Sequence, residues 1–337
     1  MPTRISVVIP AYNATRFLEQ CLASVRAQRA LVSEMIVVDD CSADGTADLA
    51  RSLGATVLST GRNAGPSAAR NIGWRAASGE LIAFLDADDY WAPDHCEVLA
   101  DLLDRFPDVE LAFSQTRTFG GSSGVTRPVL PDGVPTAVAV ALSRANLLTQ
   151  SAAMVRRRAL QAVGGYDERF RYSEDYDLWL RLAARAPFVC SHRVTSLHRV
   201  HDGQATMSEI NLVRGCWAVR TEFLQRARRT YDAATVGAVE ANLRIAYETD
   251  LTYAWDIGNR DLLMETLALH RIVPGSRPIH AAWERRRRML WYPWRVARYA
   301  FGRTPRFVVR PIRAIRSRLK SASRAAYANT EWRRRTG

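Results

Sequence analysis

The first hundred residues alternate between strand and helix patterns, and this alternation limits the fold more than any other feature. The run RISVVIP (4–10) is rich in β-branched residues and predicts a strand, whereas TRFLEQCLASVRAQ (15–28) places apolar side chains at helical spacing. The same alternation continues, with strands expected over 33–40, 55–59 and 80–86 and helices over 42–54, 65–79 and 92–106. It predicts a Rossmann-like α/β fold, with a mostly parallel sheet and helices on both faces.

Acidic residues stand where two of these strands end. Asp39 and Asp40 close the second strand, and Asp86 and Asp88 close the fourth. In open α/β sheets the ligand binds outside the carboxyl ends of the strands, at a point where the strand order reverses. We therefore expect the functional site at this edge of the sheet.

The segment FLDADDYW (84–91) places three carboxylates in four residues. Such charges repel one another unless a cation lies between them. Asp86 and Asp88 suit Mn²⁺ or Mg²⁺, which prefer oxygen ligands and are often bound by few carboxylates plus substrate phosphates. The alternative is that these residues only cap the next helix. For Asp89, which is next to that helix, we favour a capping or orienting role.

Four motifs occur in order along the first two thirds of the chain. They are PAYNAT (10–15), VVDDCSADGT (37–46), RNAGPSAARNIGWRAASGELIAFLDADDYW (62–91) and GGYDERFRYSEDYDLWLRLA (164–183). Together they resemble the inverting family 2 glycosyltransferases of GT-A fold, from about residue 4 to residue 202. The resemblance implies a GT-A domain over residues 1–208. The QxxRW motif and membrane spans of the processive members are absent from this sequence, which favours transfer of a single sugar.

The resemblance also implies a binding site for a nucleoside-diphosphate sugar, with UDP, dTDP or GDP as the nucleotide. Its base and ribose would lie against Pro10, Ala11 and Tyr12, with the ring of Tyr12 stacked on the base. Asp40 would accept a hydrogen bond from the base, and Asp39 would support Asp40 or reach the ribose. The alternatives are a half-buried core aromatic for Tyr12 and ordinary turn chemistry for the two acids.

The diphosphate and sugar of this donor would lie near RNAGPSAARN (62–71) and the DAD turn. Gly65 allows close approach of the backbone, and a helix N-terminus suits an anion. Arg70 and Asn71 would reach the diphosphate or sugar, beside Asp86, Ala87 and Asp88, although a helix-surface pair of Arg70 with Asn71 is an open alternative.

By the same resemblance, Asp175 is the general base that takes the proton of the acceptor hydroxyl, and Glu174 orients Asp175 or contacts the acceptor. Asp88, Asp86 and His201 would bind the metal ion, and Arg199 would bind phosphate. The alternatives are a simple helix start at Ser173 and a structural role for His201, as is common for a single histidine.

The remaining chain is helical in pattern over 209–282 and basic over 283–337. Residues 284–337 hold seventeen Arg and Lys and two acids, a net charge of +15, so residues 1–283 carry about −2. Arginine alternates with Trp, Tyr and Phe over 283–320, which predicts binding to an anionic membrane surface. The alternatives are nucleic acid, for which no motif is present, and a solvated or disordered tail.

The sequence thus predicts a metal-dependent inverting glycosyltransferase in the cytoplasm, at the inner face of the membrane, acting on a glycan or lipid-linked acceptor. An alternative from another class is a non-catalytic nucleotide-sugar-binding scaffold at the membrane. A third is a nucleotidyltransferase, although its glycine-rich lysine motif is absent at the N-terminus. The five scattered cysteines indicate neither a zinc site nor a disulfide framework. The sequence does not identify the sugar, the base or the acceptor.

Overall fold

A computed structural model describes residues 4–29, 32–121, 123–128, 130–131, 135–204 and 208–287. The chain forms two compact units, residues 1–239 and residues 240–337. The predicted domain boundaries at 208 and 282 stay predictions. The membrane-binding segment predicted over 283–320 lies outside the described residues from 288 onward.

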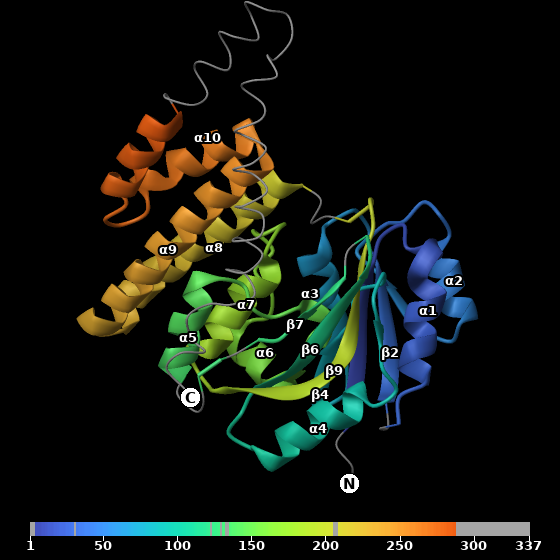
Figure 1. Ribbon diagram of the computed structural model, residues 1–337. Coiled ribbons are helices and arrows are strands. Elements are labelled where there is room, and N and C mark those ends of the chain that lie inside the picture. Colours follow the sequence, from blue (N-terminus) through green and yellow to red (C-terminus); the bar gives the residue numbers. More distant parts are fainter. Residues whose placement is uncertain are drawn as a thin grey trace, which may run out of the picture. The chain divides into compact units, whose positions relative to one another are not determined.

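The sheet of the first unit begins with four parallel strands, in the spatial order β3-β2-β1-β4. These are β1 (Ile5–Ala11), β2 (Val32–Asp39), β3 (Thr56–Ser59) and β4 (Leu81–Phe84). The helices α1 (Thr15–Arg26), α2 (Thr46–Ser52) and α3 (Pro66–Ala76) connect them (Figure 1). The predicted alternation is confirmed, and the order reverses at β1, between the two acid-bearing strands.

Helices cover both faces of this half of the sheet, as predicted. Ile5, Val7 and Ile9 of β1 pack in one core cluster with residues of α1 and of α4 (His95–Arg105). Val8 points to the opposite face, where α3 packs so closely that a Cβ on Gly73 would lie 2.3 Å from a Val8 methyl group. Successive side chains of β1 thus point to opposite faces of the sheet, and both faces are covered by helices.

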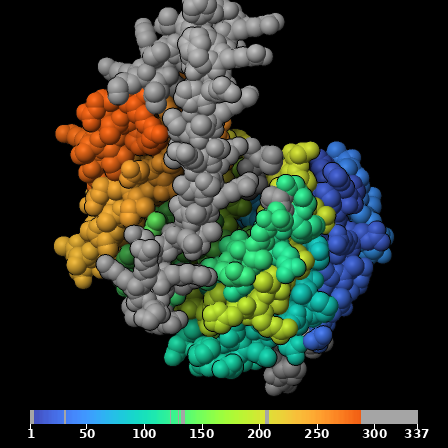
Figure 2. Space-filling model, in the orientation of Figure 1, coloured from blue at the N-terminus to red at the C-terminus, as the bar shows by residue number. Residues whose placement is uncertain are grey.

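The second half of the sheet is mixed and continues the order as β8-β6-β9-β5, with β7 paired to β6. The strands are β5 (Tyr90–Trp91), β6 (Leu111–Gly120), β7 (Gly124–Thr126), β8 (Ala153–Arg156) and β9 (Phe188–Val200). β8 runs antiparallel to both β4 and β6, whereas β9 runs parallel to β6. Figure 2 shows that the blue residues of the first helices and the green to yellow residues of these later strands share one surface of the first unit.

Three more helices lie between β7 and β9 in sequence, namely α5 (Pro135–Arg144), α6 (Arg157–Val163) and α7 (Glu174–Ala183). The predicted helical region follows as α8 (Glu209–Thr230), α9 (Ala233–Ile257) and α10 (Arg260–Ala268), with residues 277–287 also helical. None of the described helices combines the length and the apolar character needed to cross a bilayer.

Candidate active site

Backbone strain marks the carboxyl edge of the sheet. Outside glycine, positive φ angles occur among the described residues at Asn13 (49°), Cys41 (66°) and Ser173 (61°). Asn13 follows Tyr12, Cys41 follows Asp40, and Ser173 precedes Glu174, so each strained residue adjoins a predicted motif. Strain of this kind is typical of functional sites, where the surrounding structure holds the backbone in place.

The loops after β1 and β2 are joined by their own side chains. The Ser42 hydroxyl accepts from the Asn13 amide at 2.9 Å, and the Asn13 side chain accepts from the Ala43 amide at 2.9 Å. Tyr12 lies on this joined loop pair and is 53% exposed. Ala11 is buried and Pro10 half-buried beside it. Tyr12 is therefore presented on a fixed backbone with its ring open to a ligand.

The two acids after β2 have different surroundings. The Asp40 carboxylate accepts from the amides of Ala64 and Gly65, at 2.8 and 2.7 Å, and from the Thr60 hydroxyl at 2.8 Å. Asp39 accepts from the Ser42 amide at 3.2 Å through Oδ2, while its buried Oδ1 has no hydrogen-bond partner among the described residues. Asp40 thus holds the loop that leads to Gly65 and α3, and Asp39 keeps an acceptor atom free.

Arg70 of α3 joins the two acidic motifs. Its guanidinium donates to Asp86 Oδ1 and to Glu174 Oε1, each at 2.7 Å, and lies 5.4 Å from the centre of the Tyr166 ring. The Arg70 side chain is 5% exposed. Burial favours the neutral side chain, but the two carboxylates outweigh it, so the pKa of Arg70 rises above its ordinary value. The DAD turn and the ED pair therefore belong to one site.

A second set of contacts from α3 holds the loop that leads to the ED pair. The Asn71 side chain donates to the Tyr166 carbonyl and accepts from the Tyr166 amide, both at 2.9 Å, and Ser67 donates to the Phe170 carbonyl. At Gly165, where φ is 78°, an added Cβ would lie 2.5 Å from the Asn71 and Trp74 side chains. Asn71 therefore has a structural role, because it holds this loop against α3. Gly165, the second glycine of the GGYDE motif, leaves room for the Asn71 side chain.

Strand β9 brings its C-terminal residues to the DAD turn. His201 Nε2 lies 3.0 Å from Asp88 Oδ2, and the side chain of Asp88 is 28% exposed. Arg199 donates to the Asp88 carbonyl at 2.9 Å and lies between the rings of Phe17 and Phe119, 4.5 and 4.6 Å from their centres. The predicted Asp88, Arg199 and His201 thus lie together, although Asp88 is more than a hundred residues from the other two in sequence.

Asp89, the third acid of the turn, is a structural residue. It is 1% exposed and accepts from the Ser151 hydroxyl, the His198 ring and the Arg199 amide, at 2.6, 3.1 and 2.8 Å. Burial favours a neutral imidazole at His198, but the hydrogen bond to Asp89 and its charge prevail and raise the pKa of His198 to about 9. Asp89 therefore fixes β9 against the DAD turn, which agrees with the orienting role predicted for it.

Asp175 stands in the first turn of α7, beside Glu174. One of its oxygens accepts from the Tyr176 amide at 2.7 Å and the other from the Asn146 side chain at 3.2 Å. Burial, followed by the negative charge of Glu174, raises the pKa of Asp175 from 3.8 to about 7, against the opposing effects of Arg70 and both hydrogen bonds. A carboxylate with this pKa is suited to general base catalysis near neutral pH.

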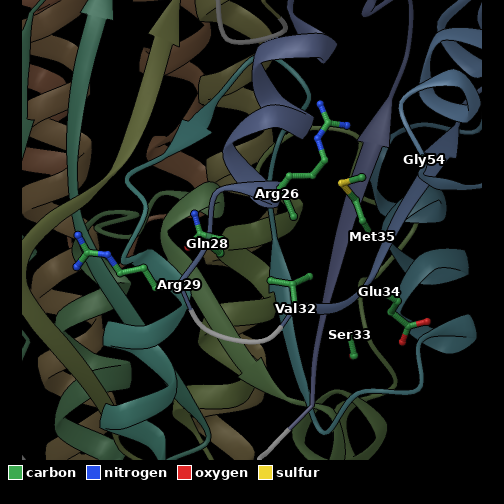
Figure 3. Close-up of a pocket in the computed structure, with 9 residues that line it drawn as sticks. Arg26, Gln28, Arg29, Val32, Ser33, Glu34, Met35 and Gly54 are labelled. Atoms are coloured by element: carbon green, nitrogen blue, oxygen red, sulfur yellow. The ribbon is translucent and has the colours of Figure 1, made fainter.

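A hollow elsewhere on the first unit is unrelated to these residues. Figure 3 shows that Arg26 and Arg29, from the end of α1 and the residues after it, line it together with Ser33, Glu34 and Met35 from the start of β2. This is the amino end of β2, whereas the predicted motifs lie at its carboxyl end. Sequence reasoning also missed Asn146 and Phe17, since no motif separates them from ordinary loop or helix residues. It assigned no role to Tyr166, although this residue lies in the GGYDE motif.

The described residues contain no cluster of three or more His, Cys, Asp or Glu arranged to hold a metal ion. Whether Asp86, Asp88 and His201 can bind a metal ion therefore depends on the chemistry of their side chains. Asp88 and His201 offer a carboxylate and an imidazole that are adjacent and partly exposed. Asp86 gives one oxygen to Arg70. This set fits a divalent ion that takes its other ligands from water and a diphosphate.

Comparison with solved structures identifies the fold class of this protein. The fold is similar to that of S. aureus TarS 1–349 in complex with UDP-GlcNAc, with a TM-score of 0.64 and 18% identity, covering 80% of this chain and 82% of that one. It is also similar to the mannosyltransferase PcManGT from Pyrobaculum calidifontis in complex with GDP-Man and Mn²⁺, with a TM-score of 0.55, 19% identity, and coverage of 96% and 87%. The fold is thus the GT-A fold of glycosyltransferases.

The family follows from sequence similarity. Residues 6–164 match the model described as "Glycosyl transferase family 2". The chain is 30% identical to the amylovoran biosynthesis glycosyltransferase AmsB of Erwinia amylovora over 226 residues, 59% of this chain and 73% of that protein. It is 27% identical to an uncharacterized glycosyltransferase of Haemophilus influenzae over 188 residues, 55% of this chain and 63% of the relative's length. The chain belongs to glycosyltransferase family 2.

Proposed function

We propose that this chain is a metal-assisted inverting glycosyltransferase that transfers one sugar from a nucleoside-diphosphate sugar to a hydroxyl acceptor. The observation that carries the proposal is the guanidinium of Arg70, which binds Asp86 of the DAD turn and Glu174 of the ED pair at 2.7 Å each. Because one side chain spans both motifs, the carboxylates at the leaving group and at the acceptor belong to a single reaction site.

The donor nucleotide binds at the loops after β1 and β2. Tyr12 stacks on the base, since its ring is 53% exposed and its backbone is fixed. The unpaired Oδ1 of Asp39 accepts the ring N–H of uracil, thymine or guanine, which is why we propose UDP, dTDP or GDP as the nucleotide. Asp40 supports this site indirectly, because its carboxylate already accepts three hydrogen bonds from the protein.

Asp88 and His201 would hold the divalent ion, Mn²⁺ or Mg²⁺, with Asp86 beside them. When bound, the ion neutralises charge that develops on the departing diphosphate. PcManGT holds Mn²⁺ and GDP-Man in a related fold, which supports a metal and a nucleotide sugar here. Arg199 contributes a fixed positive charge at the same turn, because two phenyl rings and the Asp88 carbonyl orient its guanidinium.

Asp175 acts as the general base. It takes the proton of the acceptor hydroxyl while that oxygen forms a bond to the anomeric carbon and the bond from this carbon to the diphosphate oxygen breaks. The bonding electrons leave with the diphosphate, and the proton stays on Asp175. Attack from the side opposite the leaving group inverts the anomeric configuration. With a pKa of about 7, about half of Asp175 is ionised at neutral pH, as this step requires.

The acceptor is a precursor of a cell-envelope or surface glycan, carried on a lipid. This part of the proposal is supported by the name of AmsB, which describes amylovoran biosynthesis, and by the basic aromatic segment 283–320. That segment would hold the enzyme at an anionic inner membrane face. Liposome sedimentation with and without anionic lipid, comparing the full chain with one ending at Ile279, tests this; equal pelleting of both would refute it.

The central test is a screen followed by catalysis. UDP-, dTDP- and GDP-sugars are screened with Mn²⁺ for an increase in melting temperature, because a ligand of the native state stabilises it by mass action. With the best donor, we expect transfer that stops on addition of EDTA and returns with Mn²⁺, and a product of inverted configuration by NMR. Asp175→Asn should keep donor binding and lose transfer. Near wild-type turnover in that variant, or retention of configuration, would refute the mechanism. A donor bound but never transferred by the wild type would instead indicate a scaffold protein.

A further inference from the structure

The general base proposed above is held from a second segment of the chain. Asn146 lies in the loop between α5 and the 3₁₀ turn Gln150–Ala152, and its side-chain amide donates to Asp175 Oδ2 at 3.2 Å. Its own carbonyl oxygen accepts from the Leu148 amide at 3.4 Å, so both ends of the Asn146 side chain are engaged. The Tyr176 amide takes the other oxygen, Asp175 Oδ1, at 2.7 Å.

The loop that carries Asn146 is itself fixed to the helix that carries the base. The Tyr176 hydroxyl, next to Asp175 on α7, donates to the Leu142 carbonyl of α5 at 2.6 Å. Arg220 of α8 donates to the Arg144 carbonyl, the last residue of α5, at 2.9 Å. The start of the loop is thus tied to α7 and α8, and Asn146 approaches Asp175 from a fixed direction.

These contacts leave the carboxylate able to react. A carboxylate has about four lone-pair sites, of which Tyr176 and Asn146 use one on each oxygen. The charged groups that act on Asp175 are Glu174 on its own turn and Arg70 from α3, and the phenol of Tyr166 is also close. Glu174 favours the protonated form, whereas Arg70 and the Asn146 donor favour the ionised form.

We propose that Asn146 is a positioning residue for this transferase, which orients the Asp175 carboxylate toward the acceptor and favours its ionised form. The inference rests on the proposed function of Asp175. Asn146 is an exposed loop residue outside the four motifs. Its side chain directs one oxygen of Asp175 and leaves the second lone pair of that oxygen for the incoming hydroxyl.

The test measures the titration of Asp175 directly in the full-length protein, without substrate. Protein labelled with ¹³C at the aspartate carboxyls is titrated by NMR, and the Asp175 signal is assigned by its loss in Asp175→Asn. Asn146→Ala should raise the Asp175 pKa by about one pH unit, the effect of one hydrogen bond to a charged group. Thr149→Ala, in the same loop, should leave the titration unchanged.

Kinetics of the same variants give the second readout, with the donor selected in the screen. A rise of about one pH unit reduces the ionised fraction at pH 7 about fivefold, so kcat of Asn146→Ala should fall at least that much while KM for the donor stays constant. The part of this deficit due to protonation should disappear toward pH 9. An unchanged Asp175 titration in Asn146→Ala would overturn the inference, even if Asp175→Asn is inactive. If Asp175→Asn instead keeps its turnover, the base assignment fails, and the positioning role fails with it.

Discussion

Replacing Asp175 with asparagine should make the protein more stable above neutral pH, as well as inactive. In the folded protein, burial and the charge of Glu174 raise the pKa of Asp175 to about 7. The folded state is therefore destabilised whenever Asp175 is ionised. Asparagine has nearly the same shape and carries no charge, so Asp175→Asn removes this cost. A proposed general base that lowers the stability of the fold when ionised agrees with the trade-off between stability and activity that is common at catalytic sites.

The sign and size of the effect follow from linkage between proton binding and folding. Because the folded pKa lies above the ordinary value of 3.8, the folded state binds more protons than the unfolded state between about pH 4 and pH 7. The contribution of Asp175 to the free energy of unfolding therefore falls as pH rises through this window and is constant above it. At about 1.36 kcal/mol per pH unit, the full cost is at most about 4 kcal/mol. Asp175 is only half-buried, and asparagine loses one acceptor, so we expect a net gain of about 1–3 kcal/mol above pH 7.

The assay is urea unfolding of the wild type and Asp175→Asn at pH 5, 6, 7 and 8. The difference in free energy of unfolding should be smallest at pH 5 and should grow until it reaches a plateau above pH 7. Asp108→Asn, at an exposed position between α4 and β6, removes the same charge from the surface and should give a difference that does not follow this curve. A pH-independent difference, or a less stable Asp175→Asn protein at pH 8, would refute the assigned surroundings of Asp175.

Three further outcomes are expected. Gly165→Ala should reduce the free energy of unfolding by more than about 3 kcal/mol, because an added Cβ would collide with the Asn71 and Trp74 side chains. Gly164→Ala, with nearly the same φ but open space at its Cβ, should cost about 1–2 kcal/mol. Equal losses in urea unfolding would contradict the close packing of Asn71 against Gly165. Arg70→Met should cost roughly 3–5 kcal/mol, because two carboxylates lose their shared cation, while Arg75→Met on the exposed side of α3 should cost less than about 1 kcal/mol in the same assay. Tyr12→Ala should raise KM for the donor roughly 5- to 150-fold, with kcat and melting temperature unchanged, since its ring is exposed in the folded protein; an unchanged KM would exclude base stacking.

The first half of the fold could be predicted from sequence because its elements show strong periodicity. The apolar runs of β1, of β4 and of the end of β2 are buried on both faces, as is usual in a parallel sheet, and the helical spacing of α1 buries one face, so pattern and structure agree. β8 is only four residues long and resembles a helix start, and β9 carries polar and basic residues along its length, so neither gives a strand pattern. These strands are positioned by pairing with β4 and β6, which are distant in sequence.

The candidate site divides in the same way. Sequence motifs predicted which residue types gather at the carboxyl edge of the sheet, and the structure brings Asp86, Asp88, Glu174 and Asp175 into one site through Arg70 and brings Arg199 and His201 to the same turn. A motif does not reveal how a side chain uses its hydrogen bonds. Asp40 and Asn71 are polar residues in the predicted binding motifs. In the structure, however, their polar atoms form hydrogen bonds that hold the loops before α3 and before α7.

This use of hydrogen bonds also limits how the leaving group can be stabilised. The two terminal nitrogens of Arg70 bind Asp86 and Glu174, and breaking either buried ion pair to reach a diphosphate would leave a carboxylate without its cation. Arg70 is therefore better suited to fix the distance between the two acidic motifs than to follow a departing phosphate. In the proposed mechanism, stabilisation of the diphosphate would then depend on the other edge of the DAD turn, where Asp88, Arg199 and His201 are partly exposed. In this mechanism α3 would keep the site rigid, and the end of β9 would supply the groups that stabilise the charge of the diphosphate.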